Sequence, residues 1–198
     1  MAKLINLNGA RGTGKSTITD ILKLKKTNYT LEVLHSSKLL SKMSHATYGL
    51  EINQLNYTEL FDIQQNLIDY AKGLNKDVII FDTHNIELVY QTGKIKTITP
   101  EAHIYEFGAY ITVYVDPISL LDRRKKQVSV KRNLNLLDII SEIDAERDES
   151  EKLAKMAGVN FYKINNSELD SAVEELNKII EKELDLNKEY GNKFYNNE

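Results

Sequence analysis

The most constraining feature of the sequence is a glycine-rich segment between a short apolar run and a helical pattern. Residues 3–8 read KLINLN, which predicts a strand, and residues 16–26 read STITDILKLKK, which predicts a helix. The connection fits G-x-x-x-x-G-K-S, the pattern of a loop that wraps the phosphates of ATP or GTP. The nucleotide-binding residues predicted on this ground are Gly9, Ala10, Arg11, Gly12, Thr13, Gly14, Lys15, Ser16 and Thr17.

Each residue type in this loop suits the binding of phosphate. Glycines allow the backbone to turn its N–H groups toward phosphate oxygens, and the helix N-terminus adds positive potential. Lys15 is expected to bridge the outer phosphates and to act in catalysis, and the hydroxyl of Ser16 is expected to bind Mg²⁺. Thr17 is equally consistent with an ordinary residue in the first helical turn.

A second apolar run, at residues 77–81, ends at Asp82 and predicts a strand that is buried on both faces. Ligands of parallel sheets bind beside the carboxyl ends of the strands. Asp82 therefore has the position of a second Mg²⁺ ligand next to Ser16, and its alternative is an Asp that merely starts a loop. His84 follows closely and is as consistent with a structural role as with a functional one.

Strands and helices alternate along the rest of the chain, which predicts right-handed crossovers and a parallel sheet. The expected fold class is α/β, the three-layer sandwich of P-loop NTPases, with a central parallel five-stranded sheet and helices on both faces. Further strands are expected at residues 30–35, 111–115 and 159–164, and further helices within 57–71, 100–108, 136–157 and after Ser167. Residues 83–100 carry no clear period apart from the start of the helix at Pro100.

Length and composition narrow the class of protein. The 198 residues, 41% of them hydrophobic, indicate one domain, expected at residues 1–186, with a polar and frayed tail at 187–198. The absence of cysteine excludes disulfides and thiolate chemistry. A net charge of -3 argues against a general nucleic-acid surface. No apolar run is long enough to span a membrane and no signal peptide pattern is present, so we expect a cytoplasmic protein.

A basic cluster stands out in this acidic chain, because six of the ten residues from 123 to 132 are cationic. Phosphoryl transfer requires positive charge around the migrating group and the exclusion of water, which a mobile segment closing over ATP would supply. Arg123, Arg124 and Arg132 are the catalytic candidates of this segment. Lys125 and Lys126 are also consistent with a solvated helix end.

With these residues the chain resembles a known family, the archaeal-type adenylate kinases, over most of residues 3–180. The resemblance rests on the phosphate loop, the stretch VIIFDTH ending at His84, the spacing from Arg123 and Arg124 to Arg132, and the segment AGVNFYKINN. It implies ATP on the phosphate loop, an acceptor-binding insert at about residues 36–75 and a short lid at about 123–135. It also implies that Asn165 lies near the adenine and that homo-oligomers form.

The sequence departs from this family in the acceptor region. The family holds the acceptor phosphate with arginines, yet no arginine occurs here between Arg11 and Arg123. The corresponding positions fall at Asn53 and Asp69, and an Asp would repel a phosphate. Lys38 and Lys42, one helical turn apart, could replace the arginines, although lysine offers a point charge rather than a bidentate fork.

The sequence is therefore consistent with three functions. The first is Mg²⁺·ATP-dependent transfer of the γ-phosphoryl group to a nucleoside monophosphate, with AMP implied by the resemblance. The second is a kinase of a hydroxyl-bearing small molecule, for which Glu59, Asp62 or Asp69 would accept a proton. The third is a nucleotide-dependent switch that binds a protein partner, because one phosphate loop serves both uses.

Overall fold

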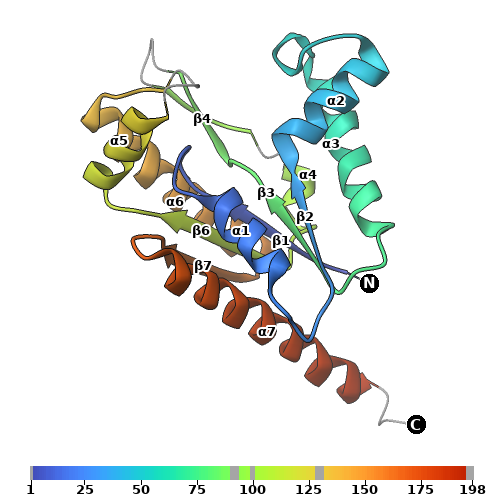
Figure 1. Cartoon of the computed structure of the whole chain (residues 1–198). Coiled ribbons are helices and arrows are strands. Elements are labelled where there is room, and N and C mark those ends of the chain that lie inside the picture. Colours follow the sequence, from blue (N-terminus) through green and yellow to red (C-terminus); the bar gives the residue numbers. More distant parts are fainter. Residues whose placement is uncertain (1, 90–93, 99–100, 128–131, 195–198) are drawn as a thin grey trace.

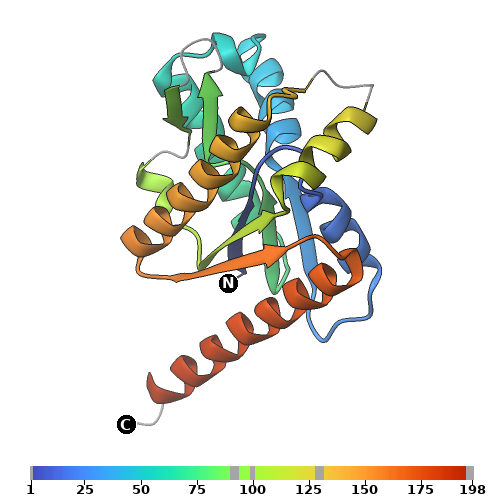
Figure 2. The ribbon, with the colours of Figure 1, turned by 90° about the vertical axis from the view of Figure 1, so that its left-hand side faces the viewer.

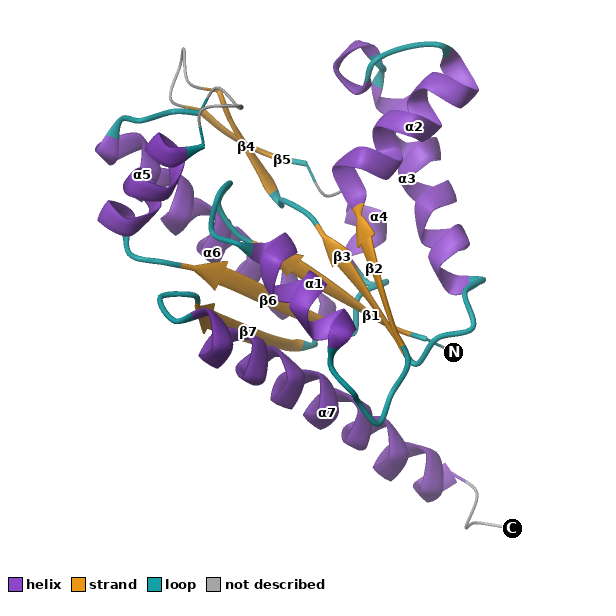
Figure 3. Cartoon of the chain, viewed as in Figure 1, coloured by secondary structure: helices purple, strands orange, loops and turns teal. Residues whose placement is uncertain are grey.

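A parallel five-stranded sheet forms the centre of the computed structural model, which describes residues 2–89, 94–98, 101–127 and 132–194. The strand order is β2-β3-β1-β6-β7 (Figures 1 and 3). Apolar side chains are buried on both faces of the central strands. The strands are β1 (Lys3–Asn8), β2 (Leu31–His35), β3 (Val78–Asp82), β6 (Ala109–Tyr114) and β7 (Asn160–Asn165). The predicted α/β fold is confirmed.

Helices cover both faces of this sheet, as Figure 2 shows from the side. Helices α1 and α7 pack on one face through Ile18, Leu22 and Leu176, and α3 and α6 pack on the other through Leu67 and Leu153. The helices are α1 (Lys15–Leu24), α2 (Ser36–Tyr48), α3 (Tyr57–Lys72), α4 (Glu101–Ile104), α5 (Pro117–Lys126), α6 (Leu136–Ala157) and α7 (Leu169–Phe194), with the 3₁₀ helix η1 (Ile52–Gln54) between α2 and α3. None of the helices in the described part of the chain has the length and apolar character needed to cross a membrane.

The structure differs from the sequence prediction in three segments. The region without a clear period contains an antiparallel pair, β4 (Ile86–Val89) and β5 (Lys94–Thr97), whose four-residue strands are too short to show a period. The helix expected from Pro100 to Gly108 is only the four residues of α4. Residues 187–194, part of the tail expected to be frayed, belong to helix α7. Residues 195–198 of the expected tail lie outside the described residues.

The register of the sheet determines where the candidate site lies. Strand β1 is hydrogen-bonded between β3 and β6, and Leu7 pairs with Asp82 while Asn8 pairs with Thr112. The segment after β1 therefore leaves the sheet beside the carboxyl ends of β3 and β6. In Figure 1, α2 and α3 stand on one side of this edge and α5 stands on the other.

A buried carboxylate attaches α7 to the sheet. Glu183 of α7 accepts hydrogen bonds from Lys3, from Asn160 (2.7 Å) and from the Tyr162 hydroxyl (2.6 Å). Burial raises the pKa of Glu183, but the three hydrogen bonds together outweigh burial and hold the pKa below its ordinary value of 4.5. The carboxylate thus contributes stability above this value, and the contribution is lost as the pH falls through the lower pKa of the folded state.

We expect the free energy of unfolding to fall steeply between roughly pH 5 and pH 3, in part because Glu183 must be protonated. The measurement is urea unfolding at a series of pH values for the wild type and for Glu183→Gln, which cannot titrate. The variant should be less stable at pH 7 and should lose less stability on acidification. Parallel pH profiles for the two proteins would contradict this assignment.

Candidate functional site

The loop between β1 and α1 has a backbone that only glycine can form at its ends. Gly9 has φ 138°, and a Cβ at this position would lie 2.1 Å from the carbonyl oxygen of Val113 in β6. Gly14 has φ 93°, and its Cβ would lie 2.3 Å from Nδ2 of Asn166. The residues that form this loop are Gly9, Ala10, Arg11, Gly12, Thr13 and Gly14. A side chain at either end would displace the neighbouring strand or turn.

Helix α1 begins at this loop with its N-terminus uncapped. Its N-cap residue is Gly14, no side chain accepts a hydrogen bond there, and the first turn contains no acidic residue. The free N–H groups and the helix dipole favour an anion at this position. Ser16 and Thr17, both exposed in the first turn of α1, stand at the same end of the helix.

Lys15 lies folded over the loop. Its side chain is buried, and Nζ donates a hydrogen bond to the carbonyl oxygen of Gly9 at 2.7 Å. Burial lowers the pKa of Lys15, and the carboxylates of Asp82, Glu146 and Glu142 oppose this effect. The Lys15 ammonium group is therefore held at the loop before any phosphate is bound, in a place where water solvates it poorly.

Ser16 and Asp82 meet as the sequence predicts. The hydroxyl of Ser16 donates to Oδ2 of Asp82 at 2.6 Å, and Nδ1 of His35 lies 3.0 Å from the same oxygen. The pair offers two hard oxygen ligands next to the phosphate loop, which fits Mg²⁺. Within the described residues no group of three or more His, Cys, Asp or Glu could hold a metal. A Mg²⁺ ion here would therefore need further ligands from the nucleotide.

Arg123 and Arg124 bind the phosphate loop from α5. Arg123 donates to the carbonyl oxygens of Thr13 (3.2 Å) and Asn166 (2.6 Å). Arg124 is 3% exposed and donates to the carbonyl oxygen of Arg11 at 2.7 and 2.9 Å. Both residues were expected on a mobile segment, whereas in the structure they lie on helix α5 and hold the loop by hydrogen bonds. Residues 128–131 of the expected lid lie outside the described residues, and Arg132 follows them.

Helix α6 contributes a buried polar stripe that the sequence analysis missed. Glu142 accepts from the backbone N–H of Arg11 (3.0 Å) and from Nη2 of Arg124 (2.8 Å). One turn further on, Glu146 binds Nδ1 of His84 (3.0 Å) and accepts from the backbone N–H of Asn85 (3.1 Å). These two carboxylates hold the phosphate loop and the loop after β3 to the same helix.

His84 is one of the groups placed by this stripe. Burial lowers the pKa of its imidazole, the charge of Lys15 acts in the same direction, and Glu146 opposes both. Only the spacing of Glu142 and Glu146, four residues apart on a predicted helix, could have indicated the stripe from sequence. The same spacing is usual on a solvated helix face.

The turn after β7, which the resemblance places near the adenine at Asn165 and Asn166, contacts the phosphate loop through Asn166. Asn166 is 2% exposed, and its Nδ2 donates to the carbonyl oxygen of Thr13 at 2.7 Å. Asn165, the predicted neighbour of the adenine, is exposed, and its Oδ1 accepts from the backbone N–H of Ser167 at 3.0 Å. Its proposed contact with a nucleotide stays a prediction.

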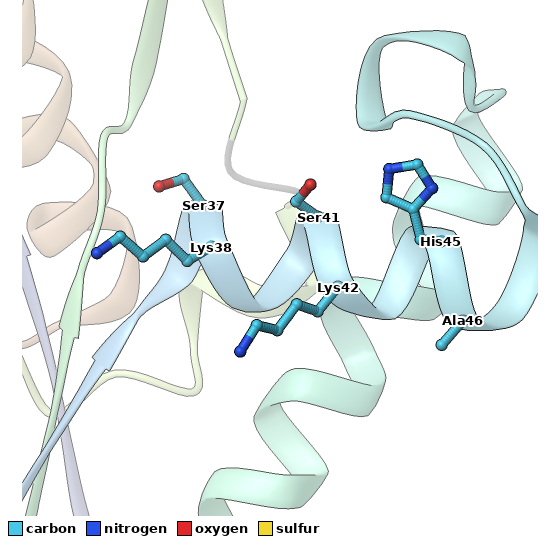
Figure 4. A pocket seen from close by; sticks show the side chains of 6 residues that line it. All are labelled: Ser37, Lys38, Ser41, Lys42, His45 and Ala46. Carbon is cyan, nitrogen blue, oxygen red and sulfur yellow. The ribbon is translucent and has the colours of Figure 1, made fainter. Parts of the chain in front are cut away.

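Helix α2 carries a shallow groove of about 740 Å³. Figure 4 shows Lys38 and Lys42 on this helix with their ammonium ends on the same side. The groove is lined by Ser37, Lys38, Ser41, Lys42, His45 and Ala46.

The acidic residues suggested as proton acceptors lie on α3 or at its start. Glu59 accepts from the backbone N–H of Asn56 and caps the helix, and Asp62 accepts from the Tyr48 hydroxyl at 3.3 Å. Asp69 is exposed and accepts from Gln65, and Asn53 is exposed in η1.

Comparison with solved structures shows the same fold in proteins of low sequence identity. The chain is similar to TT1252 from Thermus thermophilus, with a TM-score of 0.54 and 14% identity over 92% of this chain and 98% of that chain. It is also similar to a shikimate kinase from Bacteroides thetaiotaomicron, with a TM-score of 0.52 and 15% identity over 90% of this chain and 98% of that chain. No family model and no curated protein matches the sequence. The loop geometry and the sheet topology together show the fold of P-loop kinases.

Proposed function

We propose that the chain is an ATP-dependent phosphotransferase that transfers the γ-phosphoryl group to a nucleoside monophosphate, with AMP favoured by the family resemblance. The observation that carries the proposal is the meeting of three elements at one sheet edge. The uncapped N-terminus of α1, the buried Lys15 and the Ser16–Asp82 pair converge where β1 and β3 end. This arrangement suits a nucleoside triphosphate, because its negative charge must be bound and neutralised.

The residues of the loop would act by positioning and by charge. Lys15 would exchange its hydrogen bond to Gly9 for phosphate oxygens and follow the migrating group. Arg123 and Arg124 fix the loop in the shape that offers its N–H groups, and Arg132 is the candidate for a charge that closes over the phosphates. Because a monophosphate acceptor is already ionised, no strong general base is needed.

Mg²⁺ would be held by the Ser16 hydroxyl and the Asp82 carboxylate. Bound there, the ion would supply positive charge that neutralises the charge developing during transfer. His35 orients Asp82 by its contact with Oδ2 at 3.0 Å. The carboxylate is thus presented to the side of the loop where the outer phosphates of ATP are expected.

The acceptor phosphate would be bound along α2. Lys38 and Lys42 are exposed and line the same groove on α2, the helix that follows the carboxyl end of β2 (Figure 4). Two lysines attract a phosphate without fixing its orientation. A hydroxyl-bearing small molecule is the second candidate acceptor, favoured by the complete absence of arginine between Arg11 and Arg123.

The test is a coupled assay with Mg²⁺·ATP against AMP, CMP, UMP, GMP and dTMP, beside a blank without acceptor. We expect rapid turnover with one monophosphate, AMP by the resemblance, and Lys38→Ala/Lys42→Ala should raise its KM more than it lowers kcat. Slow ATP hydrolysis that no monophosphate accelerates would contradict the proposal. That result would direct the search to hydroxyl acceptors or to a protein partner of a nucleotide-dependent switch.

A further inference from the structure

A second, smaller cavity, partly open to solvent, lies beside the candidate site. Its volume is about 90 Å³, and Thr83 and His84, which follow Asp82, form one of its walls. The other walls come from the central sheet, α2, α3 and the segment around α4. The lining residues are Asn6, Ser36, Leu40, Gln64, Leu67, Ile68, Phe81, Thr83, His84, Ile98, His103 and Phe107. The cavity is smaller than a typical ligand pocket of roughly 300–1,000 Å³, so it accommodates one part of a molecule.

Most of the cavity wall is apolar and firmly packed. Phe81 and Phe107 meet edge to face with ring centroids 5.2 Å apart, and Leu67 and Ile68 are almost completely buried. Such walls suit a flat ring, because aromatic and aliphatic side chains contact its faces without hydrogen bonds.

Six of the twelve lining residues are polar, and two of their side-chain atoms have no hydrogen-bond partner within the described structure. They are Oγ of Ser36, on a side chain that is 5% exposed, and Oε1 of Gln64. The amide of Gln64 is oriented by its other atom, since Nε2 donates to the carbonyl oxygen of Ile98 at 3.4 Å. Oε1 can only accept a hydrogen bond, whereas the Ser36 hydroxyl can donate or accept. Buried polar atoms are nearly always paired, so a ligand is the natural partner of this pair.

The charge of the cavity excludes a phosphate. None of the described lining residues is Lys, Arg, Asp or Glu. The two lining histidines each have a ring nitrogen committed to a neighbour, His84 to Glu146 and His103 to Gln65, at 3.0 and 3.1 Å. The lysines of α2 line the separate open groove. A charged part of an acceptor would therefore lie outside this cavity.

We propose that this cavity binds the uncharged part of the acceptor, a flat ring that presents an N–H or O–H donor to Oε1 of Gln64 and a second polar atom to Oγ of Ser36. The assignment of this ring to an acceptor rests on the proposed kinase function. The binding itself does not, because it needs neither ATP nor catalysis. Gln64 and Ser36 are then the residues that determine which acceptor fits.

The first test measures the ligand-free protein. If Ser36 and Gln64 serve a ligand, then Ser36→Ala removes only an unpaired polar atom and should leave the melting temperature unchanged or raise it. Gln64→Met removes the unpaired Oε1 together with the long Nε2 hydrogen bond to Ile98 at 3.4 Å, so its melting temperature should change little. A role in stability requires the opposite result. A clear fall in the melting temperature of both variants would overturn the proposal, because the two atoms would then have partners in the folded chain.

The second test measures binding of uncharged probes by titration calorimetry without ATP. Adenosine is compared with purine riboside, and 2-aminopyridine with pyridine, because the members of each pair differ by one amino group. We expect at least one amino-bearing probe to bind roughly ten- to hundredfold more tightly than its counterpart, and Gln64→Met to abolish the difference. Equal binding within both pairs, or a difference that survives in Gln64→Met, would overturn the proposal.

Lys15→Ala separates this inference from the proposed function. The variant should lose turnover and keep its preference for the amino-bearing probe, since Lys15 is not among the residues that line the cavity. Probe discrimination in a wild type that transfers no phosphoryl group would preserve the binding site and reject the kinase. Turnover without probe discrimination would preserve the kinase and reject the cavity.

Discussion

Replacing Lys15 with alanine is expected to slow phosphoryl transfer by about 10²–10³-fold, the usual cost of removing one preorganised charge or donor from a transition state. The ammonium group is already buried at the loop and bonded to Gly9 at 2.7 Å, so little reorganisation precedes its contact with phosphate. Single-turnover and steady-state kinetics with saturating Mg²⁺·ATP measure the loss. The substitution should lower kcat by a larger factor than it raises the KM of the acceptor.

Lys23→Ala is the matched control, because it removes a lysine from the same helix. Lys23 lies in the last turn of α1, and its ion pair with Glu32 at 2.8 Å is largely open to water. Its loss should leave kcat unchanged. Both variants should retain a cooperative unfolding transition, which separates lost chemistry from lost structure. A Lys15→Ala protein with wild-type kcat would show that the loop is not the donor site.

The central fold could be predicted because its signals are local and strong. Residues 78–81 are all apolar, as the core of a strand buried on both faces must be, and the glycine-rich loop joins a strand to a helix. Strands β4 and β5 could not be predicted in this way. With four residues each, they are stabilised by pairing with one another rather than by a pattern that the sequence displays.

The candidate site was only partly predictable, for a similar reason. The Ser16–Asp82 contact could be anticipated, because Ser16 begins the helix that follows β1 and its loop, and Asp82 ends the neighbouring strand β3. The roles of Glu142 and Glu146 depend on which face of α6 meets the loops, and that is decided by packing far away in sequence. The role of Arg124 likewise depends on packing that the sequence does not display. Its charge suggested a lid, but its burial is visible only in the fold.

Replacing Arg124 with methionine is expected to lower the free energy of unfolding by about 3–5 kcal/mol, the usual cost of breaking a buried ion pair on one side. Arg124 and Glu142 lie 2.8 Å apart, with side chains 1% and 7% exposed. The variant leaves the Glu142 carboxylate buried next to the N–H of Arg11 alone. It also leaves the carbonyl of Arg11 without its two guanidinium donors. Urea unfolding of the ligand-free protein measures the change.

The double variant Arg124→Met/Glu142→Met tests the cause, because it removes both charges and keeps the volume apolar. Much of the lost stability should return, since a buried pair is often replaced by apolar groups at little cost. Arg147→Met is the matched control, as its pairs with Asp144 and Asp148 are exposed and contribute little. If Arg124→Met unfolds like the wild type but loses turnover, Arg124 acts on the phosphates and not through the loop. A second outcome is that Arg124→Met loses both stability and turnover and that the double variant restores only stability. In that case Arg124 stabilises the loop in the free protein and also contacts the transferred group during catalysis.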